Sequence, residues 1–495
     1  MCVKTLSFAL ILALAGCLAL AFAEEGATPL IGKGRMRAKS FTAGRFFFSA
    51  INADVDISGA NLSLDNISAA FCNGGVRGKG TFDLSKRPEL FKFDMSLFDC
   101  DAALFKGMLR TTTSLMTGKL GGRMTVSGDF VNDDMIELVG EITMNSTKNE
   151  IFETAVANVR YNKNRVYLTN LKATEPSGGI TTGEVDIAPT GPDSGFAIGK
   201  LKLSQVSVAD IFKLLVARAP WLRGTITGNA DLRYAWGQEK QQSLITGSID
   251  SSDIRLFGLP FSGTGTFEYD GTRVNIRNIS GISCGGTVTG SVVAEKGVVH
   301  LNANAAGFQL NDLMRALGTE GDLKGETEIA ASLDLTGDGG LGGNVFASVK
   351  NGRLAAAPGI MSIVTFLGIP RSAPHEFNSG SAKLKLVGRR IIVEDASLIS
   401  EKITLKNGRG YVDLTGYMHV QFDIYSETSV FSALFGKFGS TIWNLIDPVT
   451  KVVLVDVKGP FSDPKAAIVA FGKKVDVNEP IPEPEKDENK KPEEK

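Results

Sequence analysis

The chain has 495 residues, and its 53 basic and 54 acidic side chains give a formal net charge of −1 at pH 7. This balance, without a basic stripe along the sequence, argues against nucleic acid as a partner. Glycine is abundant at 56 residues, whereas histidine and tryptophan are scarce, and short apolar alternations between the glycines predict many strands and tight turns.

An apolar run at residues 6–23 follows a short segment whose only charged side chain is Lys4. Such a run predicts export, and three alternatives stay open for residues 1–23. Ala21-Phe22-Ala23 fits cleavage of a signal peptide, and Leu14-Ala15-Gly16-Cys17 fits a bacterial lipobox in which Cys17 is lipidated. The third alternative is an uncleaved anchor, because the run is about 18 residues long, the short limit for spanning a bilayer.

A short alternating pattern recurs four times along the chain. The copies are Leu62-Ser63-Leu64-Asp65-Asn66-Ile67, Val166-Tyr167-Leu168-Thr169-Asn170-Leu171, Val274-Asn275-Ile276-Arg277-Asn278-Ile279 and the looser Ile391-Ile392-Val393-Glu394-Asp395-Ala396. Period-two alternation predicts a strand whose apolar residues share one face. The Asn or Asp ends the alternation, and its short side chain favours a turn or a bulge.

Glycines mark the other fixed points of this repeat. Gly pairs follow the first three copies at Gly74-Gly75, Gly178-Gly179 and Gly285-Gly286. Each copy opens with a glycine-containing strand, and these opening glycines are Gly32, Gly140, Gly247 and Gly343. Their spacing predicts repeats at residues 30–137, 138–243, 244–340 and 341–475, followed by a charged tail at 476–495 that we expect to be disordered.

Each repeat also carries a stretch with helical spacing. The first is Leu104, Phe105, Met108 and Leu109; the second is Val208, Ile211, Phe212 and Leu215; the third is Leu310, Leu313, Met314 and Leu317. In the second, Ser207 with Asp210 three residues later predicts a capped helix start. The fourth repeat has a longer apolar helix at residues 430–446 and an apolar insertion at residues 358–377. Both are either ordinary core segments or pack at one end of the sheet as a cap or membrane-facing gate.

The predicted fold class is therefore mainly β with a few amphipathic helices, built as one repetitive antiparallel sheet without linkers between repeats. A wide sheet with one apolar face must cover that face. The face is either a closed, packed core or an open groove that holds a ligand, and the residues alone leave both alternatives open.

The repeat resembles the AsmA-like superfamily, which includes AsmA, TamB and YhdP. The resemblance is sharpest in the C-terminal third, at Gly352-Arg353-Leu354, at residues 361–370, and at Val457-Lys458-Gly459-Pro460-Phe461-Ser462-Asp463-Pro464, where the motif ends the last strand. It implies an N-terminal membrane anchor, a periplasmic body and an elongated sheet curved into a U-shaped apolar groove. It also implies phospholipid or another envelope lipid as cargo, contact with the inner or outer membrane, envelope protein partners, and a role in outer-membrane biogenesis.

Two groups of residues follow from the repeat and from this resemblance. The expected groove lining is Leu62, Leu64, Val166, Leu168, Val274, Ile276, Ile391 and Val393. The expected groove end or gate is Ile363, Phe366, Leu367, Phe431, Phe435 and Trp443. The chain is short for a bridge between two membranes and its anchor is cleavable, so it departs from the family at both points.

The sequence offers no motif for catalysis, a metal or a cofactor. His300, His375 and His419 are scattered, no paired-Cys or paired-His spacing exists, and no nucleophile elbow or phosphate loop appears. We expect no enzyme, although two distant carboxylates of a hydrolase would need no local motif. Cys72, Cys100 and Cys284 are either buried small side chains or include one disulfide. The competing function is a structural or regulatory scaffold with protein partners.

Overall fold

A computed structural model shows an antiparallel β-sheet protein. It describes residues 31–43, 46–83, 85, 90–108, 118–129, 135–145, 152–191, 194–215, 221–237, 243–256, 258–316, 324–336, 340–353, 376–400, 403–413, 416–426, 453–460 and 464–469. All 26 strands in these ranges belong to one sheet, which confirms the mainly β, repetitive fold class. No helix within these ranges is long and apolar enough to cross a membrane.

The first three sets of elements each have six main strands, with one helix before the sixth. The first set is β1 (Ile31–Ala43), β2 (Phe46–Ser58), β3 (Asn61–Phe71), β4 (Gly74–Asp83), β5 (Leu90–Asp101), α2 (Ala102–Met108) and β6 (Lys119–Asp129). The second is β7 (Glu137–Asn145), β8 (Thr154–Asn162), β9 (Arg165–Thr174), β10 (Ile180–Pro189), β11 (Gly195–Ser207), α3 (Val208–Leu215), the two-residue β12 (Leu222–Arg223) and β13 (Thr225–Trp236).

The third set is β14 (Leu244–Leu256), β15 (Leu259–Tyr269), β16 (Arg273–Ser283), β17 (Gly286–Glu295), β18 (Val298–Gln309), α4 (Leu310–Ala316) and β19 (Lys324–Thr336). The last is β20 (Leu341–Arg353), β21 (Glu376–Val387), β22 (Arg390–Ser400), β23 (Ile403–Asp413), β24 (Tyr417–Ser426), β25 (Val453–Pro460) and β26 (Lys465–Ile468). The closing motif therefore does not end the last strand, because β26 follows it. The four repeat boundaries themselves stay a prediction.

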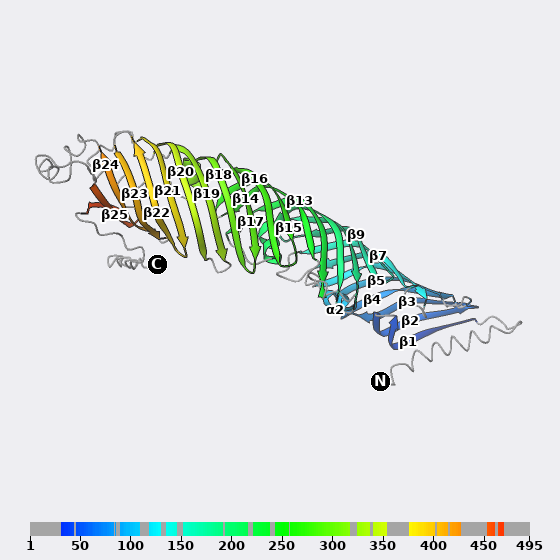
Figure 1. The fold of residues 1–495 in the computed structure, drawn as a ribbon. Coiled ribbons are helices and arrows are strands. Elements are labelled where there is room, and N and C mark those ends of the chain that lie inside the picture. Colours follow the sequence, from blue (N-terminus) through cyan, green and yellow to red (C-terminus); the bar gives the residue numbers. More distant parts are fainter. Residues whose placement is uncertain are drawn as a thin grey trace, which may run out of the picture. The chain divides into compact units, whose positions relative to one another are not determined.

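The chain forms two compact units, each an antiparallel meander. The first comprises Met1–Leu215, Arg223–Ile254 and Gly265–Val274, and the second comprises Val216–Leu222, Arg255–Thr264 and Asn275–Lys495. In the first unit each strand from β1 to β11 pairs with the next, and β11 pairs with β13. In the second unit the same order runs from β17 to β26 (Figure 1).

A meander places every second connection at the same end of its strands. In the first unit the Gly-pair turns after β3 and β9 therefore lie at the same end as α2 and α3. The helices contact mainly the strands that flank them, α2 with β5 and α3 with β11. They lie at the strand ends and do not extend across the sheet face.

The predicted helices form where the apolar spacing placed them. Asp210 N–H donates to the Ser207 hydroxyl at 3.3 Å, which confirms the predicted cap of α3. Phe105, Phe212, Leu310 and Leu313 are buried as expected. Leu104 corrects the prediction, because it lies on the solvent side of the seven-residue helix α2 and is 44% exposed. The fourth helix, the charged tail and residues 1–23 lie outside the described residues, as does the insertion except its last two residues, which begin β21.

The repeated asparagines form bulges, and the strands continue through them. Asn66, Asn170 and Asn278 have φ of 50°, 51° and 53°, in the left-handed region that asparagine tolerates better than most residues. The pairing register shifts beside Asn66 and Asn170. In the looser fourth copy the register shifts between Leu384 and Lys383, opposite Val393 and Asp395. A bulge with one extra residue lets the apolar alternation resume on the same face.

Candidate functional site

The apolar face of the first unit is continuous from strand to strand. Residues paired directly across antiparallel strands share a face, so the register defines rows that run across the sheet. One row is Val55, Leu64, Gly80, Phe93, Val126, Leu138, Tyr161, Val166, Ile187, Ala197 and Tyr234. It joins Leu64 of the first repeat on β3 to Val166 of the second on β9 across seven strands, and the predicted residues therefore share this face.

A second apolar row runs beside the first and holds Leu168. Its members are Ile67, Gly78, Met95, Met124, Gly140, Val159, Leu168, Val185, Gly199, Leu232 and Ile245. Leu62 lies in a third row, paired with Phe82 and through it with Phe91. Four of the predicted residues, namely Leu62, Leu64, Val166 and Leu168, thus mark three parallel rows of one face. That they line a lipid groove stays a prediction.

The same construction recurs within the second unit. One row is Val292, Leu301, Leu333, Gly343, Leu386, Ile391, Val412 and Met418. The next is Gly290, Ala303, Ala331, Val345, Leu384, Val393, Gly410, Val420 and Val457. Ile391 and Val393 thus belong to adjacent rows of one apolar face, as the alternation predicted. Sequence reasoning missed the other members, although the same alternation was present in their strands.

Part of the apolar face of each unit is tightly packed. In the first unit a packed cluster that includes Val76, Leu120, Leu138 and Val166 occupies much of the face. In the second unit Ile424, Val455 and Val457 are fully buried, with Val393 beside them. Two adjacent rows across β17–β21 are only half-buried, and their larger residues are Val292, Leu301, Leu333, Val345, Leu384 and Leu386. The next row on the same face, which holds Ala294, Val299 and Leu335, is buried. We call the two half-buried rows the open stretch.

The opposite face of the open stretch is mainly polar and exposed, although Phe346 and Val387 also lie on it with 42% and 50% of their surface exposed. Its side chains include Asn302, Asn304, Ser332, Asn344, Lys383 and Lys385. His300 and Asp334 pair across strands at 2.6 Å, and Lys350 pairs with Glu328 at 2.9 Å. The strands here therefore carry aliphatic side chains on one face and mainly hydrated polar side chains on the other.

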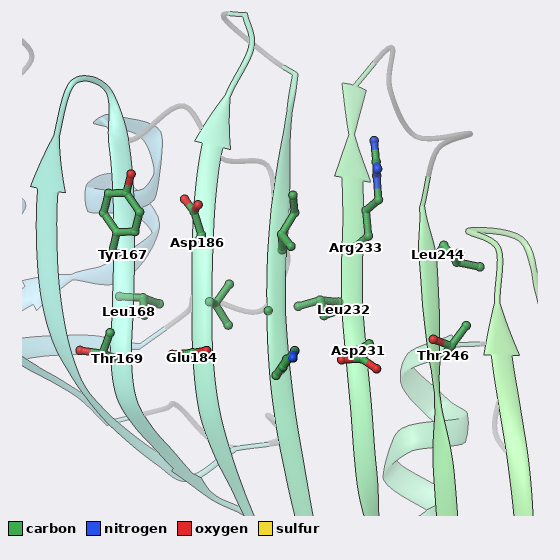
Figure 2. Close-up of a pocket in the computed structure, with 14 residues that line it drawn as sticks. Tyr167, Leu168, Thr169, Glu184, Asp186, Asp231, Leu232, Arg233, Leu244 and Thr246 are labelled. Carbon is green, nitrogen blue, oxygen red and sulfur yellow. The ribbon is translucent and has the colours of Figure 1, made fainter.

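One pocket of about 480 Å³ lies in the first unit, along strands β9 to β14. Figure 2 shows its lining at three levels across these strands, with Leu168 and Leu232 at the middle level. The upper level includes Tyr167, Asp186, Arg233 and Leu244, and the lower level includes Thr169, Glu184, Asp231 and Thr246 (Figure 2). By alternation, the flanking levels project to the face opposite Leu168. Carboxylates and cations alternate in this lining and do not converge on one point.

The predicted groove residues of the third repeat lie on β16. Val274 is buried at 4% exposure, whereas Ile276, two residues later on the same face, is half-buried. The predicted gate residues, namely Ile363, Phe366, Leu367, Phe431, Phe435 and Trp443, lie outside the described residues, and so does Cys17.

The described residues hold no cluster of three or more His, Cys, Asp or Glu side chains that would fit a metal ion. His419 pairs with Asp456 at 2.8 Å, and Tyr411 packs edge-on against the same imidazole. Cys72, Cys100 and Cys284 are buried, and burial raises the pKa of the Cys72 thiol to about 12. A thiol with so high a pKa is a weak nucleophile at neutral pH.

Comparison with known proteins adds no relative to this picture. No family model, no curated protein and no solved structure matches the chain. The AsmA-like resemblance therefore stays a prediction.

Proposed function

We propose that this chain is an AsmA-like protein of a bacterial cell envelope whose apolar sheet face binds phospholipid acyl chains. The observation that carries the proposal is the open stretch, where two adjacent rows of apolar residues cross five strands and remain only half-buried. A contiguous apolar surface of this kind on an otherwise hydrated sheet is typical of a surface that meets another apolar body.

The energetics favour an alkyl chain as that body. Each methylene moved from water to an apolar surface contributes about 0.8 kcal/mol. An acyl chain along the open stretch also removes Leu301 and Leu333 from water, so both surfaces gain. The described lining offers no convergent charged group, and the headgroup would therefore stay outside the rows.

An export signal, a periplasmic location and a role in outer-membrane lipid balance complete the proposal. They rest on the apolar run at residues 6–23 and on the resemblance of the repeat. The second candidate, a scaffold with a closed interior, is favoured by the packed cluster of the first unit. A closed interior would show packing of this kind along the whole sheet.

The test measures lipid on the purified protein. The full chain is recovered from bacterial envelopes, and bound phospholipid is quantified by mass spectrometry. We expect bound phospholipid in the wild type and its loss in Leu333→Asp, because an ionised carboxylate against alkyl chains has no partner. Ser332→Asp is the matched control, since Ser332 lies one residue away on the polar face.

Two results would reject the proposal. One is a wild-type protein that carries no lipid from the envelope and takes none from phospholipid vesicles. The other is a Leu333→Asp protein that folds and binds as much lipid as Ser332→Asp. Loss of the fold in Leu333→Asp alone would instead favour the closed scaffold.

A further inference from the structure

We call the junction between a strand and the helix that follows it a joint, and in each of the first three repeats the last residue of the strand donates a hydrogen bond to the neighbouring Gly-pair turn. In the first repeat, Asp101 N–H donates to the carbonyl of Cys72 at 2.6 Å. In the third, Gln309 N–H donates to the carbonyl of Cys284 at 3.0 Å. Both acceptors are backbone oxygens beside a Gly-pair turn, and neither bond contains an ionisable group.

The second repeat makes the same joint with a side chain. Here the equivalent donor is Ser207 N–H, the last residue of β11, and it donates to Glu175 Oε2 at 2.8 Å. The Ser177 hydroxyl donates to the same oxygen at 2.9 Å. A carboxyl group thus takes the place that a backbone carbonyl holds in the other two joints.

This carboxyl group is buried and half satisfied. Glu175 is 1% exposed, and none of the described residues donates a hydrogen bond to its Oε1. The turn closes tightly around it, since a Cβ on Gly179 would lie 2.5 Å from Oε2. An ionised carboxylate in this position leaves one charged oxygen without water or a donor.

We propose that Glu175 is a proton-operated latch that closes the turn between β9 and β10 onto the joint between β11 and α3 when it is protonated, and loosens that joint when it ionises. Opening the turn would bring Oε1 to water, so ionisation favours the open form. This inference does not depend on lipid binding, because it concerns only the joint.

The charges around the group support this direction. Burial raises the pKa of Glu175, the bonds from Ser207 and Ser177 lower it, and the nearby carboxylate of Asp210 on α3 raises it. Asp210 is the one titratable group among the described residues whose charge acts on Glu175. A carboxyl group with a raised pKa in the fold stabilises it fully below the unfolded pKa. That contribution is lost as the pH rises through the folded pKa.

Hydrogen exchange of the full chain tests the latch. Exchange is followed by mass spectrometry from about pH 4 to about pH 8 and corrected for the intrinsic pH dependence of amide exchange. We expect the segments around Glu175 and Ser207 to lose protection as the pH rises. The segment around Gln309, whose joint has a backbone acceptor, should not change in this way.

Three variants make the result decisive. Glu175→Gln keeps an acceptor for Ser207 N–H and should abolish the pH dependence. Glu184→Gln, an exposed carboxyl group on β10, should retain it. Ser177→Ala removes a bond that favours the ionised form and should move the midpoint to higher pH, a readout that stands even if Glu175→Gln fails to fold. Equal pH dependence in wild type and Glu175→Gln, or an unmoved midpoint in Ser177→Ala, would overturn the proposal.

Discussion

The left-handed asparagines are the residues that let the alternation of each repeat continue. A β-branched side chain at such a φ clashes with its own backbone, at a cost of about 1–2 kcal/mol. Asn170 has φ 51° and lies in β9 next to a register shift. The bulge therefore depends on a residue type that tolerates this conformation.

We expect Asn170→Val to lower the free energy of unfolding by about 1–2 kcal/mol. Asn170→Gly is the matched control, because glycine adopts this φ freely and its only cost is the larger backbone entropy that it loses on folding. The two variants are compared by chemical denaturation. Equal stability of the valine and glycine variants would show that the left-handed conformation at Asn170 is not what the position requires.

At the residue scale, the position of the bulge could be predicted from the sequence, whereas the role of Glu175 could not. Three copies of an apolar alternation ending in asparagine identified the position, and only the choice between turn and bulge was open. Glu175 was not predicted because its role depends on a hydrogen bond from Ser207, which lies 32 residues away in the sequence. An alignment of the joints would have offered one signal, a glutamate before the second Gly pair where Cys72 and Cys284 precede the others.

Each repeat opens with a glycine-containing strand, and whether a larger residue would fit in place of this glycine depends on the neighbouring strands. A Cβ on Gly140 would lie 2.2 Å from the carbonyl oxygen of Arg123 and 2.6 Å from Met124 Cα. A Cβ on Gly32 would meet nothing within 4 Å. The difference arises because Gly140 on β7 lies between β6 and β8, whereas Gly32 is paired only with β2 among the described strands.

Gly140→Ala should therefore destabilise the chain by about 1–3 kcal/mol, since backbone atoms must move to admit the methyl group. Gly32→Ala, at the same place in the first repeat, should change stability by less than about 0.5 kcal/mol. Thermal unfolding of both variants measures the difference. A Gly140→Ala protein as stable as Gly32→Ala would mean that β6 and β7 are not packed as described.

The helices could be predicted from the sequence because the patterns that indicate them lie within a few residues. Helical spacing and a capping serine are local, and α3 begins where Ser207 placed it. The position of the helices at the strand ends was not predictable, because it follows from the meander, in which every second connection returns to the same end.

For the whole molecule, the open question is whether the apolar face conducts lipid or is closed. The sequence identified the face through its alternation, but the degree of burial depends on contacts between distant strands and could not be read from it. In the structure, fully buried stretches and half-buried stretches share the same apolar pattern. A charge placed on the face distinguishes the two states, because its cost depends on access to water.

Ile276 and Val274 on β16 provide this comparison within two residues. Both lie on the apolar side of the strand, yet Val274 is buried and Ile276 is half-buried. Ile276→Asp keeps access to water and should leave the protein folded at normal abundance, but it should block acyl chains, since an unpaired carboxylate facing alkyl chains is strongly disfavoured. Val274→Asp buries its charge and should destabilise the protein by several kcal/mol.

Both variants are expressed in a strain that depends on this protein for outer-membrane integrity, with abundance, melting temperature and bound phospholipid measured in parallel. Loss of the fold in both variants would favour a closed core, and an Ile276→Asp protein that is stable and fully active would reject a conducting groove at this position.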